Sequence, residues 1–248
     1  MLNCQNITVT YGKTHTVLRG ISFCAKAGEI TAVLGANGSG KSTLLRAVMH
    51  EIPYKGTVTL NGCDLSKTPP AGRALQISML PQHLPAPALT VWETVALGRT
   101  PHTTHLGEQD RTVIENALAK CEITHLRDRR TDLLSGGERQ KVFLALLLAQ
   151  DTPVLLLDEP TTYMDLSFTA RFFRILQEER DRGKAILLVM HDLTDAFAVA
   201  DSLVILKDGS VAFFGSPTDA LAQDLPERIF GVQQYTAQRG EKTAYFFR

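Results

Sequence analysis

The chain has 248 residues, and its 26 lysine and arginine residues balance 26 aspartate and glutamate residues, so the formal net charge is zero. Apolar residues make up 44% and charged residues 21%, which is typical of a globular chain and not of a disordered one. The missing basic excess argues against nucleic acid and anionic membrane surfaces as partners. The longest apolar runs, such as 144–149, fall far short of the ~20 residues of a membrane-spanning helix.

The start of the chain and its cysteines indicate a compartment. The first residues carry neither the basic nor the apolar stretch of a secretion signal. Cys4, Cys24, Cys63 and Cys121 show no CxxC spacing, which argues against a disulfide framework and a zinc site. We therefore expect a cytoplasmic protein with reduced thiols.

Short β-branched runs dominate the first third of the chain. They predict strands at 7–10, 29–34 and 56–60, separated by turn-forming Gly, Asn and Asp residues. A helical run at 43–50 follows the second of these strands. This part predicts a mixed sheet that leads into one helix.

The middle of the chain is predicted to be helical. Three prolines at 81–87 mark a break between lobes. A capping box at Thr90 and Glu93 opens one helix, and apolar residues at helical spacing from 113 to 121 mark a second. We expect a helical lobe from about residue 83 to about residue 150.

The last part returns to alternating strands and helices. Near-continuous apolar runs at 154–157 and 186–190 predict strands of a buried parallel sheet, and an apolar stripe at 168–176 predicts the helix between them. The elements expected after these are a helix at 192–200, a strand at 203–206, a hairpin turn at 207–210 and a short tail.

A glycine-rich loop after the strand 29–34 matches the pattern GxxxxGK[ST]. It consists of Gly35, Ala36, Asn37, Gly38, Ser39, Gly40, Lys41, Ser42 and Thr43. Glycines let successive backbone amides point at phosphate oxygens, and the helix N-terminus adds its positive end. Lys41 is expected to reach the β- and γ-phosphates, and the Ser42 hydroxyl is expected to sit on Mg²⁺.

Carboxylates end the apolar strand at 154–157. Asp158 lies where the phosphate crevice of such a sheet is expected, and it would hold Mg²⁺ through water. Glu159 would polarise the water that attacks the γ-phosphate. The pair predicts nucleotide hydrolysis.

A second candidate phosphate site opens the helical run at 142–148. Ser135 and Glu138 form a capping box around Gly136 and Gly137, which leave bare amides at a helix tip. A second phosphate-binding tip implies a second wall around the nucleotide. A symmetric dimer would supply that wall without folding the helical lobe back over its own site.

Together these motifs resemble those of the ATP-binding subunits of ABC transporters. The Walker A loop at 35–43, the signature at 134–140 and the Walker B strand at 154–159 follow in the family's order, and the resemblance covers nearly the whole chain. It implies an α/β fold: a P-loop NTPase (RecA-like) core with an antiparallel β subdomain and an inserted helical subdomain. The single domain, 1–248, would have its core at 1–82 and 151–230, the helical subdomain at 83–150 and a C-terminal tail at 231–248.

The resemblance also assigns roles to four scattered residues. Tyr11 matches the aromatic residue that stacks on adenine, and Gln82 matches the glutamine that reaches Mg²⁺ and the attacking water. Asp165 matches the D-loop, which contacts the opposite subunit. His191 matches the switch histidine at the γ-phosphate. The expected catalytic residues are therefore Glu159, His191 and Gln82, with Mg²⁺ held by Ser42, Gln82 and Asp158.

Family membership would further imply an ATPase with partners. The resemblance implies a head-to-tail dimer with each ATP between one Walker A loop and the partner's signature. It also implies integral membrane permease subunits, an extracytoplasmic substrate-binding protein as an indirect partner, no nucleic acid, and a peripheral position on the cytoplasmic side of the membrane.

Two stretches resemble the ATPases of importers for ferric citrate, ferric siderophores, haem and vitamin B12. They are Ala96–His102 and 149–165, with departures at Met164 and at Ser167-Phe168. Two other classes compete with this interpretation. An ABC ATPase of DNA repair or the ribosome would usually carry tandem cassettes, coiled coils or basic arms, and a P-loop kinase or GTPase would lack the signature helix.

Overall fold

We describe the computed structural model of the chain over residues 1–12, 14–239 and 242–248. These residues divide into two compact units, which are described separately. Unit 1 comprises Met1–Lys67 and Ala185–Arg248, and unit 2 comprises Thr68–Lys184. The predicted subdomain boundaries at 82/83 and 150/151 do not coincide with this division and stay predictions; the predicted tail includes residues 240–241, which lie outside the described residues.

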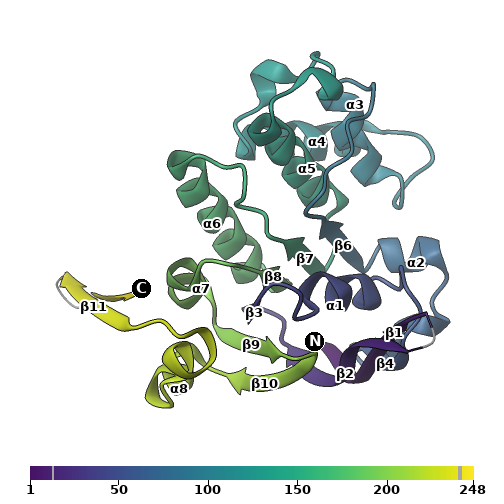
Figure 1. Cartoon of the computed structure of the whole chain (residues 1–248). Helices are drawn as coiled ribbons and strands as arrows, with labels where there is room; N and C mark the ends of the chain where they lie inside the picture. The colour runs from purple at the N-terminus through teal and green to yellow at the C-terminus, as the bar shows by residue number, and fades with distance from the viewer. Residues whose placement is uncertain (13, 240–241) are drawn as a thin grey trace. The chain divides into compact units, whose positions relative to one another are not determined.

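Two sheets form the body of unit 1 (Figure 1). The antiparallel sheet has the order β2-β1-β4-β5, and the second sheet runs β10-β9-β3-β8, with β3 parallel to both β8 and β9. The strands are β1 (Leu2–Tyr11), β2 (His15–Ala25), β3 (Glu29–Gly35), β4 (Lys55–Leu60), β5 (Cys63–Asp64), β8 (Ala185–Val189), β9 (Ser202–Lys207) and β10 (Ser210–Gly215).

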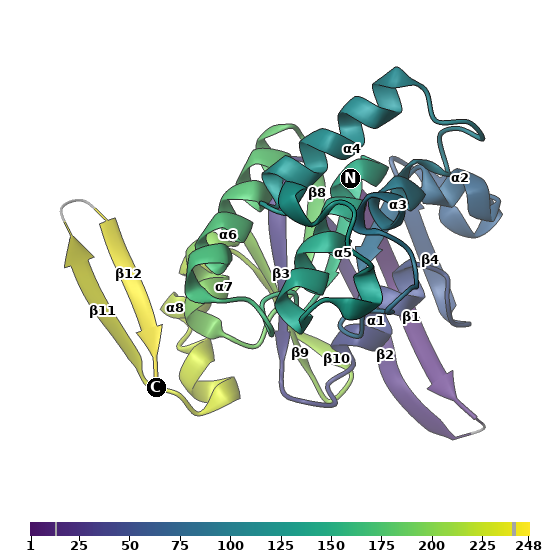
Figure 2. The same cartoon turned by 90° about the horizontal axis from the view of Figure 1, so that it is seen from above.

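Short helices and a hairpin complete unit 1. They are α1 (Lys41–Val48), α7 (Leu193–Val199), α8 (Pro217–Ala222) and the strands β11 (Gln234–Arg239) and β12 (Lys242–Phe247). The hairpin projects from the rest of its unit, and the Phe247 ring packs on Phe197 of α7 with centroids 4.8 Å apart (Figure 2). This part of the chain, expected to be a short tail, contains the two strands β11 and β12.

The predicted strands of unit 1 are confirmed, because buried apolar side chains alternate or run continuously where the pattern required them. All of β8 is buried, as a parallel strand covered on both faces should be. The hairpin turn between β9 and β10 is also confirmed. Asp208 and Gly209 have φ values of 50° and 75°, the pair of positive values that a tight turn of this kind needs.

Unit 2 contains a parallel strand pair and five α-helices among its described residues. The strands are β6 (Ile77–Leu80) and β7 (Val154–Asp158), which pair in parallel. The helices are α2 (Pro70–Ala74), α3 (Val91–Ala96), α4 (Glu108–Lys120), α5 (Gly136–Gln150) and α6 (Leu166–Asp181). The predicted helices of the middle region are confirmed, and α3, α4 and α5 pack on one another (Figure 2).

A buried ionic cluster joins α4 to α6. The Glu179 carboxylate, 2% exposed, lies 2.9 Å from Lys120 Nζ and 3.0 Å from Lys184 Nζ. Burial alone would raise the pKa of Glu179, but the hydrogen bond from Lys120 and the charge of Lys184 outweigh it and lower that pKa. Removing one partner of such a buried pair costs about 3–5 kcal/mol, so the cluster fixes the two helices together.

In the described part of the chain, every helix is either too short or too polar to span a bilayer.

Candidate functional site

The Walker A loop of unit 1 runs between β3 and α1. Gly38 and Gly40 have φ values of 79° and 103°, which residues with a side chain rarely adopt. A Cβ added to Gly40 would lie 2.5 Å from the Leu18 side chain. Gly40 is also the N-cap of α1, so the helix begins without any side-chain cap. The loop therefore exposes backbone amides where a side chain could neither fit nor satisfy them.

Lys41 holds this loop in a curled form. It is 5% exposed, and its ammonium donates to the carbonyl oxygens of Gly35 at 2.9 Å and Ala36 at 3.3 Å. The Ser39 hydroxyl oxygen is buried and has no hydrogen-bond partner within the described chain. An enclosed cation, a buried hydroxyl and a helix tip suit an anionic group, so the residues present fit a bound phosphate.

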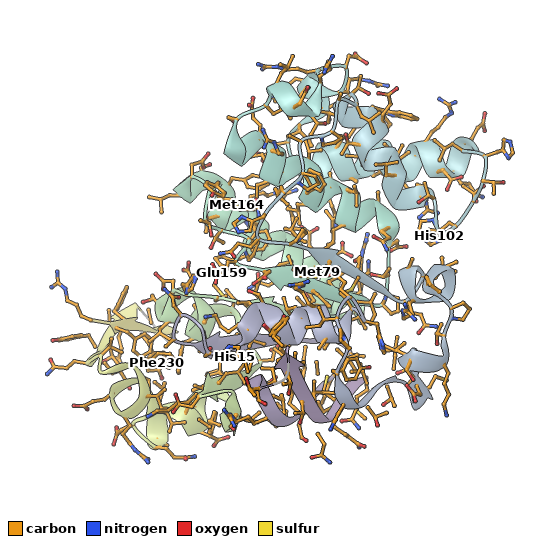
Figure 3. All side chains as sticks on the ribbon, turned by 45° about the vertical axis from the view of Figure 1, so that its right-hand side comes forward. His15, Met79, His102, Glu159, Met164 and Phe230 are labelled. Carbon is orange, nitrogen blue, oxygen red and sulfur yellow. The ribbon has the colours of Figure 1, made fainter. Side chains whose placement is uncertain are left out.

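The rest of unit 1 places the remaining predicted residues near strand ends. Tyr11 ends β1 and is partly exposed, while His191 is exposed and follows the end of β8 after one intervening residue, Met190. A cavity of about 290 Å³ borders the Walker A loop. Its lining includes His15, which Figure 3 labels, Val17, Ser39 and Ile229, but not Tyr11.

Glu159 and Gln82 meet in unit 2. Gln82 Nε2 donates to Glu159 Oε2 at 2.5 Å, so the structure brings these two predicted catalytic residues together. Glu159 is 9% exposed and has a φ of 49°, a backbone conformation that costs about 1–3 kcal/mol for a non-glycine residue (Figure 3). Strain of this kind is typical of functional positions. Asp158, 3% exposed, ends β7 immediately before it.

The predicted capping box at the signature is confirmed. Ser135 Oγ accepts a hydrogen bond from the Glu138 amide at 3.3 Å, and Glu138 Oε2 accepts from the Ser135 amide at 2.9 Å. The Ser135 hydroxyl and amide lower the pKa of Glu138, which keeps its carboxylate charged. Because the Glu138 amide is used, Gly136 and Gly137 supply the donors of this tip.

Asp165 stabilises the start of α6, whether or not it also lies at an interface. Its Oδ1 accepts from the Phe168 amide at 2.7 Å and so caps α6. Met164, one of the departures from the importer pattern, precedes it in the same loop (Figure 3). The cap alone would explain an aspartate at this position.

The stretch Ala96–His102 has a structural explanation at the far end of α5. A Cβ on Gly98 would lie 2.6 Å from the Leu146 carbonyl oxygen. Arg99 donates to the carbonyl of Ala149 at 2.9 Å and pairs with Asp110, while His102 Nε2 lies 2.7 Å from the carbonyl oxygen of Gln150. These side chains satisfy carbonyls that the helix end leaves open.

The predicted site residues thus fall into two groups, one in each unit. Unit 1 holds Tyr11, the Walker A loop and His191; unit 2 holds Gln82, the signature, Asp158, Glu159 and Asp165. Sequence reasoning gave no role to Tyr163, which lies in the loop between Glu159 and α6 and packs on the start of α5. It also gave none to Gln140 of α5, which donates to the carbonyl of Pro160 in that loop. An aromatic residue in the short loop 160–165 was the available signal for the first.

Comparison with known sequences identifies the family. The model of the family described as "ABC transporter" matches residues 18–162. The ferric enterobactin transport ATP-binding protein FepC of Escherichia coli is 37% identical over 238 residues, which cover 94% of this chain and 88% of FepC. The hemin import ATP-binding protein HmuV of Nocardia farcinica is 41% identical, with 88% of this chain and 77% of HmuV covered.

A third relative and two solved structures agree. The iron(3+)-hydroxamate import ATP-binding protein FhuC of Bacillus subtilis is 34% identical, with 93% of this chain and 88% of FhuC covered. An ATP-binding subunit of an ABC transporter matches with a TM-score of 0.83 and 25% identity over 90% of this chain and 93% of its own. The dimeric bacterial ABC transporter cassette MJ0796 matches with a TM-score of 0.80 and 26% identity over 88% and 99%. The expected fold is confirmed.

Proposed function

This chain belongs to the ABC transporter family as an ATP-hydrolysing subunit, and from that premise we propose that it energises the uptake of an iron chelate, haem or cobalamin-type ligand. Relatives whose names mention ferric enterobactin, hemin or iron(3+)-hydroxamate support the substrate class. The observation that carries the catalytic part is the hydrogen bond between Gln82 and the strained, buried Glu159. It holds a carboxylate in one orientation at the end of a buried strand.

In the proposed site the Walker A loop binds the phosphates of ATP. The amides of Gly38 to Thr43 and the Lys41 ammonium, which now rests on the Gly35 and Ala36 carbonyls, would turn to the phosphate oxygens. Tyr11 would stack on the adenine, and His191 would contact the γ-phosphate. These residues would hold the nucleotide in place and would transfer no proton themselves.

Mg²⁺ fits the oxygen donors of this chain. Ser42, Gln82 and Asp158 offer a hydroxyl, an amide oxygen and a carboxylate, the hard ligands that this ion prefers. When bound, Mg²⁺ neutralises phosphate charge. Glu159 then accepts a proton from the attacking water, and Gln82 orients both the carboxylate and that water.

We place the second wall of each ATP site on another copy of the chain. The tip at Ser135, Gly136 and Gly137 would face the partner's ATP, and Asp165 would lie at the same interface. The dimeric MJ0796 cassette supports this arrangement. The chain would dock on membrane permease subunits at the cytoplasmic face of the membrane and would meet a substrate-binding protein only through them.

The substitution Glu159→Gln tests the catalytic assignment. It keeps the size of the side chain and its contact with Gln82 but removes the base, so turnover should fall about 1,000-fold while ATP binding remains. The variant should accumulate as an ATP-bound dimer in light scattering. Glu122→Gln is the matched control, because Glu122 also has a positive φ, of 59°, but lies exposed outside the site. Turnover at the wild-type rate in Glu159→Gln would refute the assignment.

The substrate class needs a separate experiment. The tagged chain, purified in mild detergent from the cells that produce it, should carry along a membrane permease identifiable by mass spectrometry. The reconstituted complex should take up a ferric siderophore or haem in an ATP-dependent manner. Co-purification of ribosomes or of DNA would instead favour the non-transport class of ABC ATPase.

A further inference from the structure

Three contacts join the first two turns of α5 to the loop that follows Glu159. The ring of Tyr163 packs over Gly136, where an added Cβ would lie 3.6 Å from Tyr163 Cγ and Cδ1. The carbonyl oxygen of Tyr163 lies so close to Gly137 that a Cβ there would approach it to 2.8 Å. Gln140 Nε2 donates to the carbonyl of Pro160 at 2.9 Å. Each contact lies within unit 2.

The same loop is tied to the catalytic carboxylate residue. The amide and the hydroxyl of Thr162 donate to the carbonyl oxygen of Glu159, the hydroxyl at 2.9 Å. Tyr163 is the next residue, so a shift of its backbone away from Gly137 would be passed to the turn that holds the Glu159 carbonyl. Gln140 is 1% exposed, and its bond to Pro160 is therefore shielded from water.

A small cavity completes this connection. Its volume is about 200 Å³, and its lining contains Gln82, Gly136, Arg139 and Tyr163. Gln82 is the residue that donates to Glu159. The Tyr163 ring therefore stands at a point where the glutamine loop, the signature turn and the loop after Glu159 come together.

From these contacts we propose that Tyr163 is a positioning residue, which keeps the signature tip in register with Glu159 of the same chain. The inference rests on the proposed function, in which this tip serves ATP held by a second copy. Tyr163 acts through ring contacts with Gly136 and through its backbone at Gly137, and its hydroxyl takes no part in them. Tyr163 is 60% exposed, so one face of its ring can pack on Gly136 while the rest of the side chain stays in contact with solvent.

The test compares Tyr163→Ala with Tyr163→Phe in the Glu159→Gln background. The alanine variant should need about ten times more ATP for dimerisation in light scattering, because the loss of the ring loosens the tip. ATP binding to the monomer, followed with a fluorescent ATP analogue, should stay within about twofold, because the Walker A loop is unchanged. Tyr163→Phe should behave like the parent. In the otherwise wild-type chain, Tyr163→Ala should raise the KM for ATP more than it lowers kcat.

A second variant separates positioning from direct contact with the partner copy. Gln140 is too deeply buried to touch another chain, yet Gln140→Met breaks its bond to Pro160. Positioning predicts that it weakens ATP-dependent dimerisation as Tyr163→Ala does, whereas direct contact predicts no weakening. Thermal unfolding confirms that each variant is folded. Tyr235→Ala removes another half-exposed tyrosine, from β11, and should change neither quantity.

The outcomes distinguish this inference from the proposed function. If Glu159→Gln alone fails to dimerise with ATP, the shared-site arrangement is wrong. If Glu159→Gln dimerises and Tyr163→Ala has the same ATP dependence, only the positioning role is refuted. If Tyr163→Ala weakens dimerisation but Gln140→Met, still folded, does not, Tyr163 acts by touching the partner and the proposal is also refuted.

Discussion

The helices α1 and α5 both begin beside glycines, but they satisfy their first turns in opposite ways. α1 follows Gly40, has no side-chain cap and carries no acidic residue in its first turn. α5 follows Ser135, which forms a reciprocal capping box with Glu138 in the first turn. The negative charge of Glu138 repels that of a phosphate. We infer that the α1 tip can bind phosphate by itself, whereas the α5 tip needs a nucleotide that is already held.

The largest effect expected from this difference is that of Ser135→Arg. The long side chain should block the α5 tip and lower turnover about 100-fold, while ATP binding to the α1 site stays within about twofold. Steady-state hydrolysis and equilibrium binding of labelled ATP measure the two quantities. Ser216→Arg is the control, because Ser216 likewise caps a short helix, α8, by accepting from the Asp219 amide at 3.1 Å. Dimerisation of Ser135→Arg with ATP would contradict the shared-site arrangement.

An intermediate effect is expected from Gly40→Ala at the α1 tip. A side chain there combines a φ of 103° with a clash against Leu18, which should destabilise the fold by about 2 kcal/mol and weaken ATP binding about tenfold. Thermal unfolding and ATP titration measure both. Gly231→Ala has a similar backbone strain, with a φ of 70°, but open space around it. Gly231→Ala should therefore lose some stability but keep its affinity for ATP. Equal effects of the two variants on both quantities would show that backbone strain alone, and not the clash with Leu18, weakens ATP binding.

The smallest effect is expected from Glu138→Gln. Glutamine can still accept from the Ser135 amide but carries no charge, so dimerisation should require about two to three times less ATP. The control Glu93→Gln changes the corresponding residue of the capping box at α3, where Glu93 accepts from the Thr90 amide at 2.8 Å. Weaker dimerisation of Glu138→Gln would mean that the capping hydrogen bonds of the carboxylate favour dimerisation more than its charge repulsion toward phosphate opposes it.

Glu138 also gives this comparison a pH dependence. Because its pKa is lowered in the folded chain, its charge stabilises the fold fully above the ordinary carboxyl value of about 4.3. That contribution disappears as the pH falls through the lowered folded value. The difference in unfolding free energy between the parent and Glu138→Gln, under ~1 kcal/mol, should therefore vanish in acid. Urea titrations at several pH values measure it.

The local sequence predicted those elements whose pattern has one dominant cause. The buried strands β7 and β8 and the capping boxes at Thr90 and Ser135 are confirmed, because burial and capping act over a few residues. No expectation covered β2. Register shifts in its pairing with β1 interrupt the alternation, and Gly20 has a φ of 67° there.

The candidate site was predictable to the same extent. Motif spacing placed Lys41 in a glycine loop and Glu159 after a strand, but not the hydrogen bond that Gln82 makes over 77 positions of sequence. The contacts of Tyr163 and Gln140 depend on how a loop folds back on a helix. Such contacts leave no periodicity in the sequence, so only the three-dimensional structure reveals them.

The bonds at the two ends of α5 have a mechanical consequence. Its last carbonyls are held by Arg99 and His102. Its first two turns are held by the contact of Tyr163 with Gly136 and by the hydrogen bond from its own Gln140 to the loop before α6. A helix fixed at both ends cannot tilt by itself, because tilting would break contacts at one end or the other. The turn at Ser135 should therefore move only when the residues that hold the two ends of α5 also move. The helix would then transmit a displacement from one end to the other as a rigid body.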